Sequence, residues 1–491
     1  MDRPVILKSF LIRNIMTGQV LAAAAIAVSI ANSPEARAQS LTDALISAYS
    51  NNPTLQAQRA SLRAVDEKAP QALSNWRPTI SATSDFTREI TRRNTRADGK
   101  KRAVQSPRGV ELTVSQPLFR GFRTQAAISS AENEIRAARN RLLNVEQETL
   151  LDAVTAYMDV VRNQAILELN IGNQQVLRRQ LEAADDRFEV GEITRTDVSQ
   201  AKARLSGATA ERIQAEGNLE ISRATYLNVI GEVPGKLVRP TKDFADLPEH
   251  KNAALNLAEK IHPTVRAAIY DERAAHDDVK ETEGELLPRL TLNGTINYRN
   301  ELATDSDFST ERSIGATLTV PLYQSGSVYS RIRQAKQTAG QQRRLVDQAR
   351  RTVQEDASQA WQTLLTARAR IESFKAQVEA NKIALEGVQR EAAVGSRTVL
   401  DILDAEQELL DAKVNLVGAQ RDETVAIFSV KSTTGQLTAE QLKLKVDIYD
   451  PFKHYNEIRG KWFGTQASEQ IENTLIPGYE DADAVQQKNK L

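Results

Sequence analysis

The most regular pattern of chemically capable residues lies in two short segments that share one spacing. Each segment has a glycine, a threonine three residues later and an aspartate three residues after that: Gly191, Thr194 and Asp197 in the first, and Gly395, Thr398 and Asp401 in the second. The Thr-x-x-Asp spacing is typical of a helix N-terminus, where hydroxyl and carboxylate accept hydrogen bonds from free amides. The threonines are therefore predicted helix caps, and the glycines are predicted left-handed turns.

Two charged residues distinguish the second segment from the first. Arg397 corresponds to Ile193 in the first segment, and Asp404 corresponds to Gln200. Helix capping accounts for neither charge. The second segment is therefore predicted to have a task that the first does not have.

Residues that could support catalysis form no recognisable site. The chain has no cysteine, and its four histidines lack metal-ligand spacing: His250, His262, His276 and His454. It has no phosphate-binding loop and no nucleophile motif. We therefore expect no catalytic residue, metal or cofactor, and an enzyme is the least favoured function.

The overall composition favours long helices packed along narrow seams. The sequence contains 64 basic and 64 acidic residues, so it gives no indication of a nucleic-acid partner. Aromatic residues make up only 5%, which argues against a large globular core.

The first 38 residues resemble a secretory signal peptide. Lys8 and Arg13 supply positive charge, 20–30 form an apolar run, and 36–38 read Ala-Arg-Ala. A transmembrane anchor is the alternative, but the run is shorter than the ~20 residues that span a bilayer. Cleavage is predicted before Gln39.

Five anchors recur in one order and indicate a tandem duplication. Among them, Asn52-Pro53 recurs as His262-Pro263, Gln116-Pro117-Leu118-Phe119 recurs as Val320-Pro321-Leu322-Tyr323, and Gly231 recurs as Gly435. We predict repeat 1 at 39–235 and repeat 2 at 236–436, followed by a partly disordered tail at 437–491.

Each repeat is predicted to contain a helical region, two strands, a very long helix and a shorter returning helix. The helical ranges are 41–73 (with breaks at Pro53 and Pro70), 121–188 and 197–230, then 252–286, 326–392 and 401–434. Apolar and small residues recur in the long helices at spacings of three and four, which predicts coiled-coil seams.

The four predicted strands alternate between apolar and polar residues. In the first, Ile80 and Ala82 share one face while Thr79 and Ser81 share the other. A half-buried sheet of a soluble domain is one interpretation. Lipid against the apolar face is the favoured one, because no other segment offers a compact apolar cover. Four strands cannot close a transmembrane barrel, so several chains must share it; two chains give eight strands and three give twelve.

The segment 91–108 joins two of these strands and is strongly basic. We expect an external loop that faces anionic lipid or saccharide, and a solvated charged loop is an equal alternative.

The chain resembles the TolC family of outer-membrane efflux and secretion ducts. The motifs that carry the resemblance are Asn52-Pro53, Pro117-Leu118, Pro321-Leu322, both glycine turns, and V-G-S-R-T-V-L-D-I-L-D-A at 394–405. It implies a mainly α-helical fold in which a homotrimer combines a long periplasmic helical barrel with a shared 12-stranded transmembrane β-barrel.

The resemblance also implies partners and a location. These are the outer-membrane lipid of a Gram-negative bacterium, a periplasmic adaptor (membrane fusion) protein, and an inner-membrane pump of the RND or ABC type. The chain would be a passive exit duct for efflux or type I secretion. A periplasmic coiled-coil adaptor or scaffold is the alternative function.

The same resemblance implies roles for the second segment. Asp401 and Asp404 match aspartates whose rings line the periplasmic aperture. Arg397 matches an arginine that bonds to the first hairpin near Thr196 and Asp197 and holds the aperture closed.

The turns themselves match surfaces that meet the adaptor, with Val190 beside Gly191 and Val394 beside Gly395. One position departs from the family pattern, because Ala392 replaces an expected tyrosine. We therefore expect a weaker or differently built lock.

Overall fold

The computed structural model describes residues 39–95, 99–240, 247–300 and 307–465. The predicted signal peptide at 1–38 lies outside these residues. The helices are α2 (Leu41–Asn51), α3 (Pro53–Asp66), α4 (Lys68–Ser74), α5 (Arg123–Glu189), α6 (Arg195–Ile230), α7 (Lys251–Ile261), α8 (Pro263–Glu283), the 3-10 turn η1 (Gly284–Leu286), α9 (Ser327–Ala393), α10 (Val399–Thr433) and α11 (Lys453–Ile458). None of the described helices combines the length and apolar character that crossing a bilayer requires.

The long helices α5 and α9 each contain 67 residues and confirm the predicted pair of very long helices. They begin slightly later than predicted because the preceding residues turn the chain with positive φ angles. Gly121 and Phe122 have φ angles of 63° and 61° before α5, and Ser325 and Gly326 have 51° and 78° before α9. A right-handed helix cannot continue through that conformation.

Proline begins two of the shorter helices. The Asn52 side chain accepts hydrogen bonds from the amides of Thr54 and Leu55 (2.9 and 3.2 Å), and Pro53 follows in the first turn of α3. His262 does the same for α8, with Nδ1 accepting from the Thr264 amide at 3.2 Å. The single helix expected at 252–286 is therefore wrong, because proline starts a new helix at this position as it does in the first repeat.

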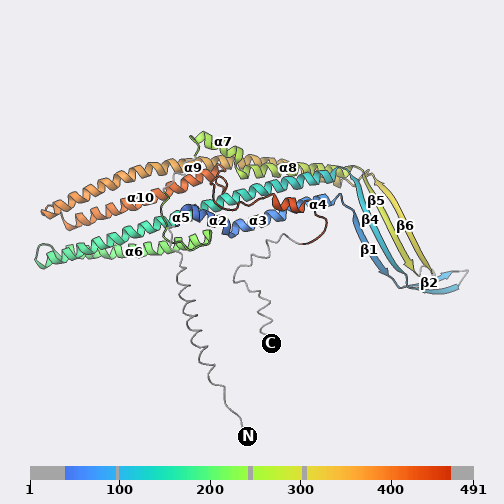
Figure 1. Cartoon of the computed structure of the whole chain (residues 1–491), viewed down its shortest axis with the longest axis horizontal. Helices are drawn as coiled ribbons and strands as arrows, with labels where there is room; N and C mark the ends of the chain where they lie inside the picture. The colour runs from blue at the N-terminus through green and yellow to red at the C-terminus, as the bar shows by residue number, and fades with distance from the viewer. Residues whose placement is uncertain (1–38, 96–98, 241–246, 301–306, 466–491) are drawn as a thin grey trace, which may run out of the picture. The chain divides into compact units, whose positions relative to one another are not determined.

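The four predicted strands form one antiparallel sheet. They are β1 (Thr79–Phe86), β4 (Arg108–Arg120), β5 (Arg289–Asn300) and β6 (Phe308–Thr319), in the order β1-β4-β5-β6 (Figure 1). Strands from different repeats are neighbours in this sheet, because β4 of the first repeat pairs directly with β5 of the second.

The strand register separates two faces of this sheet. On one face the paired rows include Ile80, Val114, Gly294 and Ile314, then Ala82, Leu112, Ile296 and the charged exception Arg312. On the other face they include Ser81, Thr113, Thr295 and Ser313, then Thr83, Glu111, Asn297 and Glu311. Hydrogen bonds such as Ser115 Oγ to Asn293 Oδ1 (2.9 Å) link side chains on the polar face. The alternation predicted from the sequence is therefore a property of the whole sheet.

The basic segment expected as a loop instead contains a β-hairpin. Strands β2 (Glu89–Thr95) and β3 (Gly99–Gln105) pair with each other as a separate two-stranded sheet (Figure 1). Ile90 lies opposite Val104 within it, and Arg92 lies opposite Arg102. The many charges hid this short alternating pattern from the sequence interpretation.

The described residues divide into two compact units. One contains α2, α6 and the adjoining parts of α5, α9 and α10; the other contains the strands, the remaining helices and the rest of those three long helices. Each unit includes segments from both repeats. The two sequence repeats therefore do not correspond to the two compact units.

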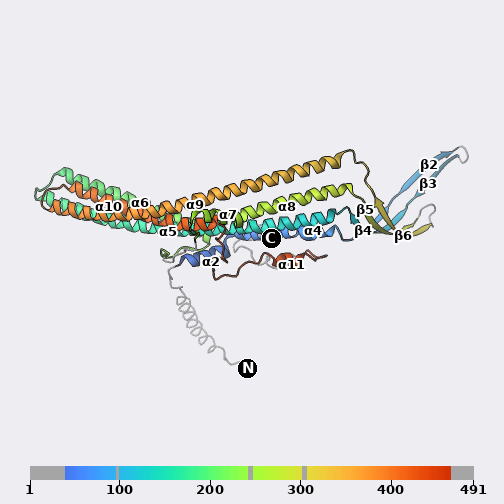
Figure 2. The ribbon, with the colours of Figure 1, turned by 90° about the horizontal axis from the view of Figure 1, so that it is seen from above.

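Small residues form the helix seams of the first of these units. Ala184 on α5 and Ala201 and Ala208 on α6 pack in one buried cluster with Leu177 and Leu403. On the second hairpin, Leu385 of α9 packs against Ile402 and Leu409 of α10, and the two helices lie side by side (Figure 2). Alanine lets helix axes approach closely, which agrees with the predicted seams.

The C-terminal segment contacts helices between Leu437 and Arg459. Leu437 and Ala439 are fully buried, and the Ala439 amide donates a hydrogen bond to the Glu146 carboxylate at 2.7 Å. The Arg139 guanidinium lies 4.1 Å from the Phe452 ring centroid and 5.1 Å from that of Tyr455. The rest of the predicted tail, 466–491, lies outside the described residues.

Asp66, at the end of α3, is a buried acid beside this segment. Among the described residues, neither of its carboxylate oxygens accepts a hydrogen bond. Burial raises its pKa to about 6, although the nearby Arg139 guanidinium acts in the opposite direction. The folded chain therefore holds this proton more tightly than the unfolded chain does.

We expect the thermal stability of the protein to fall as pH rises from 4 to 7, because Asp66 must then ionise while buried. Asp66→Asn should remove its share of this loss and stabilise the chain at pH 7 by roughly 1–2 kcal/mol, below the ~3 kcal/mol set by two pKa units. Circular dichroism melts across this pH range measure the effect. Glu67→Gln removes a smaller contribution to the same pKa shift and should reduce the slope less than Asp66→Asn does. An Asp66→Asn protein with an unchanged slope would contradict the assignment.

Candidate functional site

The two helical hairpins end in the same backbone turn. Gly191 and Gly395 have φ angles of 80° and 79°, the left-handed region that favours glycine. Glu192 N–H donates to Arg187 O at 2.9 Å, and Ser396 N–H donates to Glu391 O at 3.0 Å. These bonds close the C-terminal ends of α5 and α9.

The returning helices begin with matching caps. At α6, the Thr194 hydroxyl accepts from the Asp197 amide, and the Asp197 carboxylate accepts from the Thr194 amide at 2.9 Å. At α10, the Asp401 carboxylate accepts from the amide and hydroxyl of Thr398 at 2.8 and 2.7 Å. These bonds hold the pKa of the Asp401 carboxyl below its usual value, so that this residue carries a negative charge at neutral pH.

The turns leave apolar side chains on the surface. Val190 is 71% exposed and Val394 is 81% exposed. A Cβ atom added at Gly191 or Gly395 would meet no other atom within 4 Å among the described residues. Both turns therefore present open surfaces.

Arg397 forms its ion pairs within the second hairpin. Its Nε lies 2.9 Å from Glu391 Oε2, and its Nη1 lies 3.9 Å from Asp401 Oδ1. Among the described residues of one chain, none of its ion pairs involves Asp197. The predicted contact with the first hairpin near Thr196 and Asp197 thus stays a prediction, and it would need a neighbouring chain.

A different ion pair joins the two hairpins of one chain. Arg204 Nη2 on α6 lies 2.5 Å from Asp404 Oδ1 on α10, and both side chains are about half exposed. Asp404, the carboxylate without a counterpart in the first hairpin, is therefore tied to the first hairpin by a cation.

Sequence reasoning missed Arg204 and Glu391. A charge comparison between the repeats could have found Arg204, because its counterpart 204 residues later is Glu408. Glu391 likewise corresponds to Arg187. Neither residue lies in the short turn segments whose charges were compared between the repeats: Arg204 lies further along α6, and Glu391 precedes the turn in α9.

Ala392 lies in the seam of the second hairpin. It is partly buried and packs against the cluster formed by Leu385, Ile402 and Leu409. A methyl group here can pack between helices but cannot form the hydrogen bond of a tyrosine hydroxyl. The polar contacts near Ala392 include the Arg397–Glu391 ion pair and a hydrogen bond from Gln389 Nε2 to Glu406 Oε1 at 3.3 Å.

Known proteins share both the sequence pattern and the fold. The family described as "Outer membrane efflux protein" matches residues 44–232 and 254–436, one segment in each repeat. Outer membrane efflux protein BepC of Brucella suis is 36% identical over 448 residues, which cover 91% of this chain and 96% of that protein. Outer membrane protein TolC of Vibrio cholerae is 28% identical, with 82% and 92% covered.

A solved structure has the same fold at lower sequence identity. The CmeC outer membrane channel of Campylobacter jejuni superposes with a TM-score of 0.73 and is 16% identical, with 86% of this chain and 89% of that chain covered. Because the family match extends through both repeats, the chain belongs to the outer membrane efflux protein family.

Proposed function

We propose that this chain is the outer-membrane exit duct of a tripartite efflux pump or a type I secretion system, and that its hairpin ends gate the duct. The observation that carries the proposal is the family match over both repeats, each of which contains a hairpin turn flanked by charged residues. Family membership does not favour the adaptor or scaffold alternative.

The sheet supports a membrane-spanning role for three copies of the chain. Its 12-residue strand β5 extends about 40 Å, which crosses about 28 Å when tilted by ~45°. One face is apolar and exposed, as contact with lipid requires, and the opposite face is polar, as a water-filled lumen requires. In a homotrimer, twelve such strands close one barrel.

The hairpin turns support docking to a periplasmic adaptor, which in turn engages an inner-membrane pump of the RND or ABC type. The open surfaces at Gly191 and Gly395 carry the exposed Val190 and Val394. Exposed apolar residues in a small patch are typical of contact surfaces between proteins.

The second hairpin is the proposed selectivity element. Three copies of Asp401 and Asp404 would place six carboxylates around one aperture, where they attract cations and repel anions. Arg204 and Arg397 offset part of this charge through their ion pairs.

Asp401→Asn combined with Asp404→Asn should reduce cation selectivity and weaken block by multivalent cations about tenfold, because the aperture loses its carboxylates. Thr398, the N-cap residue of α10, still accepts from the amide of residue 401, so the turn should persist. Reversal potentials of single channels in a salt gradient measure the change. Asp411→Asn on the same helix is the matched control. Reversal potentials equal to those of the parent would refute the selectivity role.

A further inference from the structure

The C-terminal segment ends in two exposed aromatic residues. Trp462 is 58% exposed and Phe463 is 87% exposed. Exposed apolar patches, as distinct from single exposed side chains, mark contact sites. The family resemblance and the hairpin ends give these two residues no role.

The segment that precedes them is held in place by cations stacked on its rings. Arg139 lies over Phe452 and Tyr455, and Arg459 on the segment pairs with Glu132 of α5 at 3.2 Å. Such stacking contacts stabilise the attachment of a segment most strongly where they exclude water. The segment is therefore fastened along α5 rather than loosely attached.

Arg77 fixes the last aromatic residues beside the first strand. Its guanidinium lies 4.8 Å from the Trp462 ring centroid, and its Nη1 donates to Lys461 O at 2.8 Å. Arg77 is two residues before Thr79, where β1 begins. Trp462 is thus placed where the sheet meets the helices.

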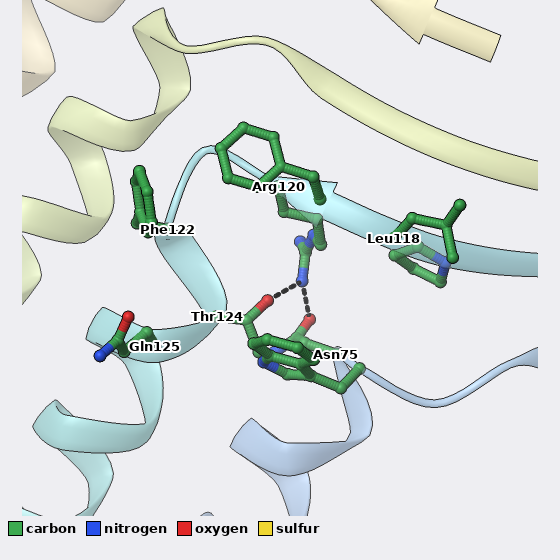
Figure 3. Close-up of a pocket in the computed structure, with 9 residues that line it drawn as sticks. Asn75, Leu118, Arg120, Phe122, Thr124 and Gln125 are labelled. Carbon is green, nitrogen blue, oxygen red and sulfur yellow. Dashed lines mark hydrogen bonds between the residues drawn. The ribbon is translucent and has the colours of Figure 1, made fainter.

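More aromatic residues surround a pocket at the same end of the sheet. Trp76 is 57% exposed, and the rings of Phe119 and Phe122 meet edge to face at 5.2 Å. These rings line a cavity of about 130 Å³ in which Arg120 Nη1 donates to Asn75 Oδ1 at 2.5 Å and to Thr124 Oγ1 at 3.3 Å (Figure 3). Phe119 also pairs with Leu290 in the sheet.

The aromatic rings and basic side chains described above lie next to the apolar face of the sheet. The row that contains Leu290 and Leu318 is the end of that face nearest the helices. In membrane proteins, aromatic residues gather where acyl chains give way to headgroups, and arginine and lysine attract the lipid phosphates there. A lipid surface matches both the exposed rings and the basic Arg77 and Lys461.

We propose that Trp462 and Phe463 anchor the C-terminal segment in the periplasmic leaflet of the outer membrane, beside Trp76. The partner is the phospholipid headgroup region. This inference rests on the proposed membrane-spanning role of the sheet. The anchor fixes the segment's end to the bilayer as well as to the helices.

The chain contains only three tryptophans, which makes the anchor measurable by fluorescence. The full-length trimer is reconstituted into phosphatidylcholine vesicles with and without brominated acyl chains. W76F with W361F leaves Trp462 as the reporter. W76F with W462F leaves Trp361, which packs in a helix cluster with Leu364 and Val430 and is the control. Replacing all three by phenylalanine and adding Ile296→Trp reports on the sheet.

We expect brominated lipid to reduce the Trp462 emission by about half, because the ring lies at headgroup depth, and to leave Trp361 unchanged. Quenching of Ile296→Trp without quenching of Trp462 overturns the anchor and keeps the membrane-spanning sheet. Quenching of neither reporter overturns both. Trp462 emission that is shielded from aqueous iodide but insensitive to brominated lipid shows that protein covers the ring, and this also overturns the anchor.

Discussion

Alanine at both Arg204 and Arg397 is expected to raise the single-channel conductance several-fold over the parent. Arg204 ties Asp404 to the first hairpin of the same chain, and Arg397 offsets the charge of Asp401. Without them, six uncompensated carboxylates in a trimer would repel one another across the aperture. The resting state should therefore shift towards an open one.

The expected effect is large because the same weak ion pair occurs in each chain of the proposed trimer, and not because any one contact is strong. A half-exposed ion pair contributes about 0.5 kcal/mol. The Arg204–Asp404 pair in each of three chains then amounts to roughly 1.5 kcal/mol. A difference of this size changes an open-to-closed ratio by about tenfold.

The measurement is conductance of the purified protein in planar bilayers at low and high salt. The difference from the parent should shrink at ~1 M salt, where exposed charges are screened within ~3 Å. Arg212→Ala is the matched control, since Arg212 pairs with Glu216 inside α6 and joins no second helix.

Reversing both charges of the Arg204–Asp404 ion pair distinguishes a specific contact between these residues from a general effect of charge at the aperture. Arg204→Asp alone should open the duct, and Arg204→Asp with Asp404→Arg should restore the parent conductance. Failure of the reversal to restore it, or no rise in the alanine variants, would exclude this ion pair as the lock. Asp197→Asn alone tests the predicted contact between Arg397 and Asp197 of a neighbouring hairpin, because it keeps the Arg397–Asp401 pair of the second hairpin and should open the duct only if that contact exists.

Local sequence patterns were sufficient for most of the fold. Period-two alternation predicted the four sheet strands, and Thr194 and Thr398 marked helix starts through bonds made within three residues. Such contacts lie close in sequence, so spacing alone reveals them. The repeat offset then paired each feature with its counterpart.

Contacts between distant residues were not predictable in this way. Arg204 and Asp404 are 200 residues apart, and nothing in their local spacing indicates that they meet. The pairing of β4 with β5 was not predictable for the same reason, because it joins strands from two different repeats. The β2–β3 hairpin was not predicted for a different reason, since its charged residues resemble those of a solvated loop.

Gly121→Ala is expected to destabilise the protein by about 3 kcal/mol or more and to lower the yield of folded protein strongly. Gly121 turns the chain from β4 into α5 with φ +63°, where an added Cβ costs about 1–2 kcal/mol. The same Cβ would stand 2.4 Å from Gly284 O and 2.8 Å from Leu287 Cβ. Backbone atoms cannot move aside as a flexible side chain can, so overpacking adds a further 1–3 kcal/mol.

The second repeat provides the control for this position. Gly326 precedes α9 with φ +78°, but a Cβ there would meet nothing within 4 Å among the described residues. Gly326→Ala should therefore cost only the conformational term of about 1–2 kcal/mol. Thermal unfolding of both variants, followed by circular dichroism, measures the two costs. Equal losses would mean that the close approach of Gly121 to Gly284 does not constrain the corner, whereas a larger loss at Gly121 shows that this backbone contact sets how β4 joins α5.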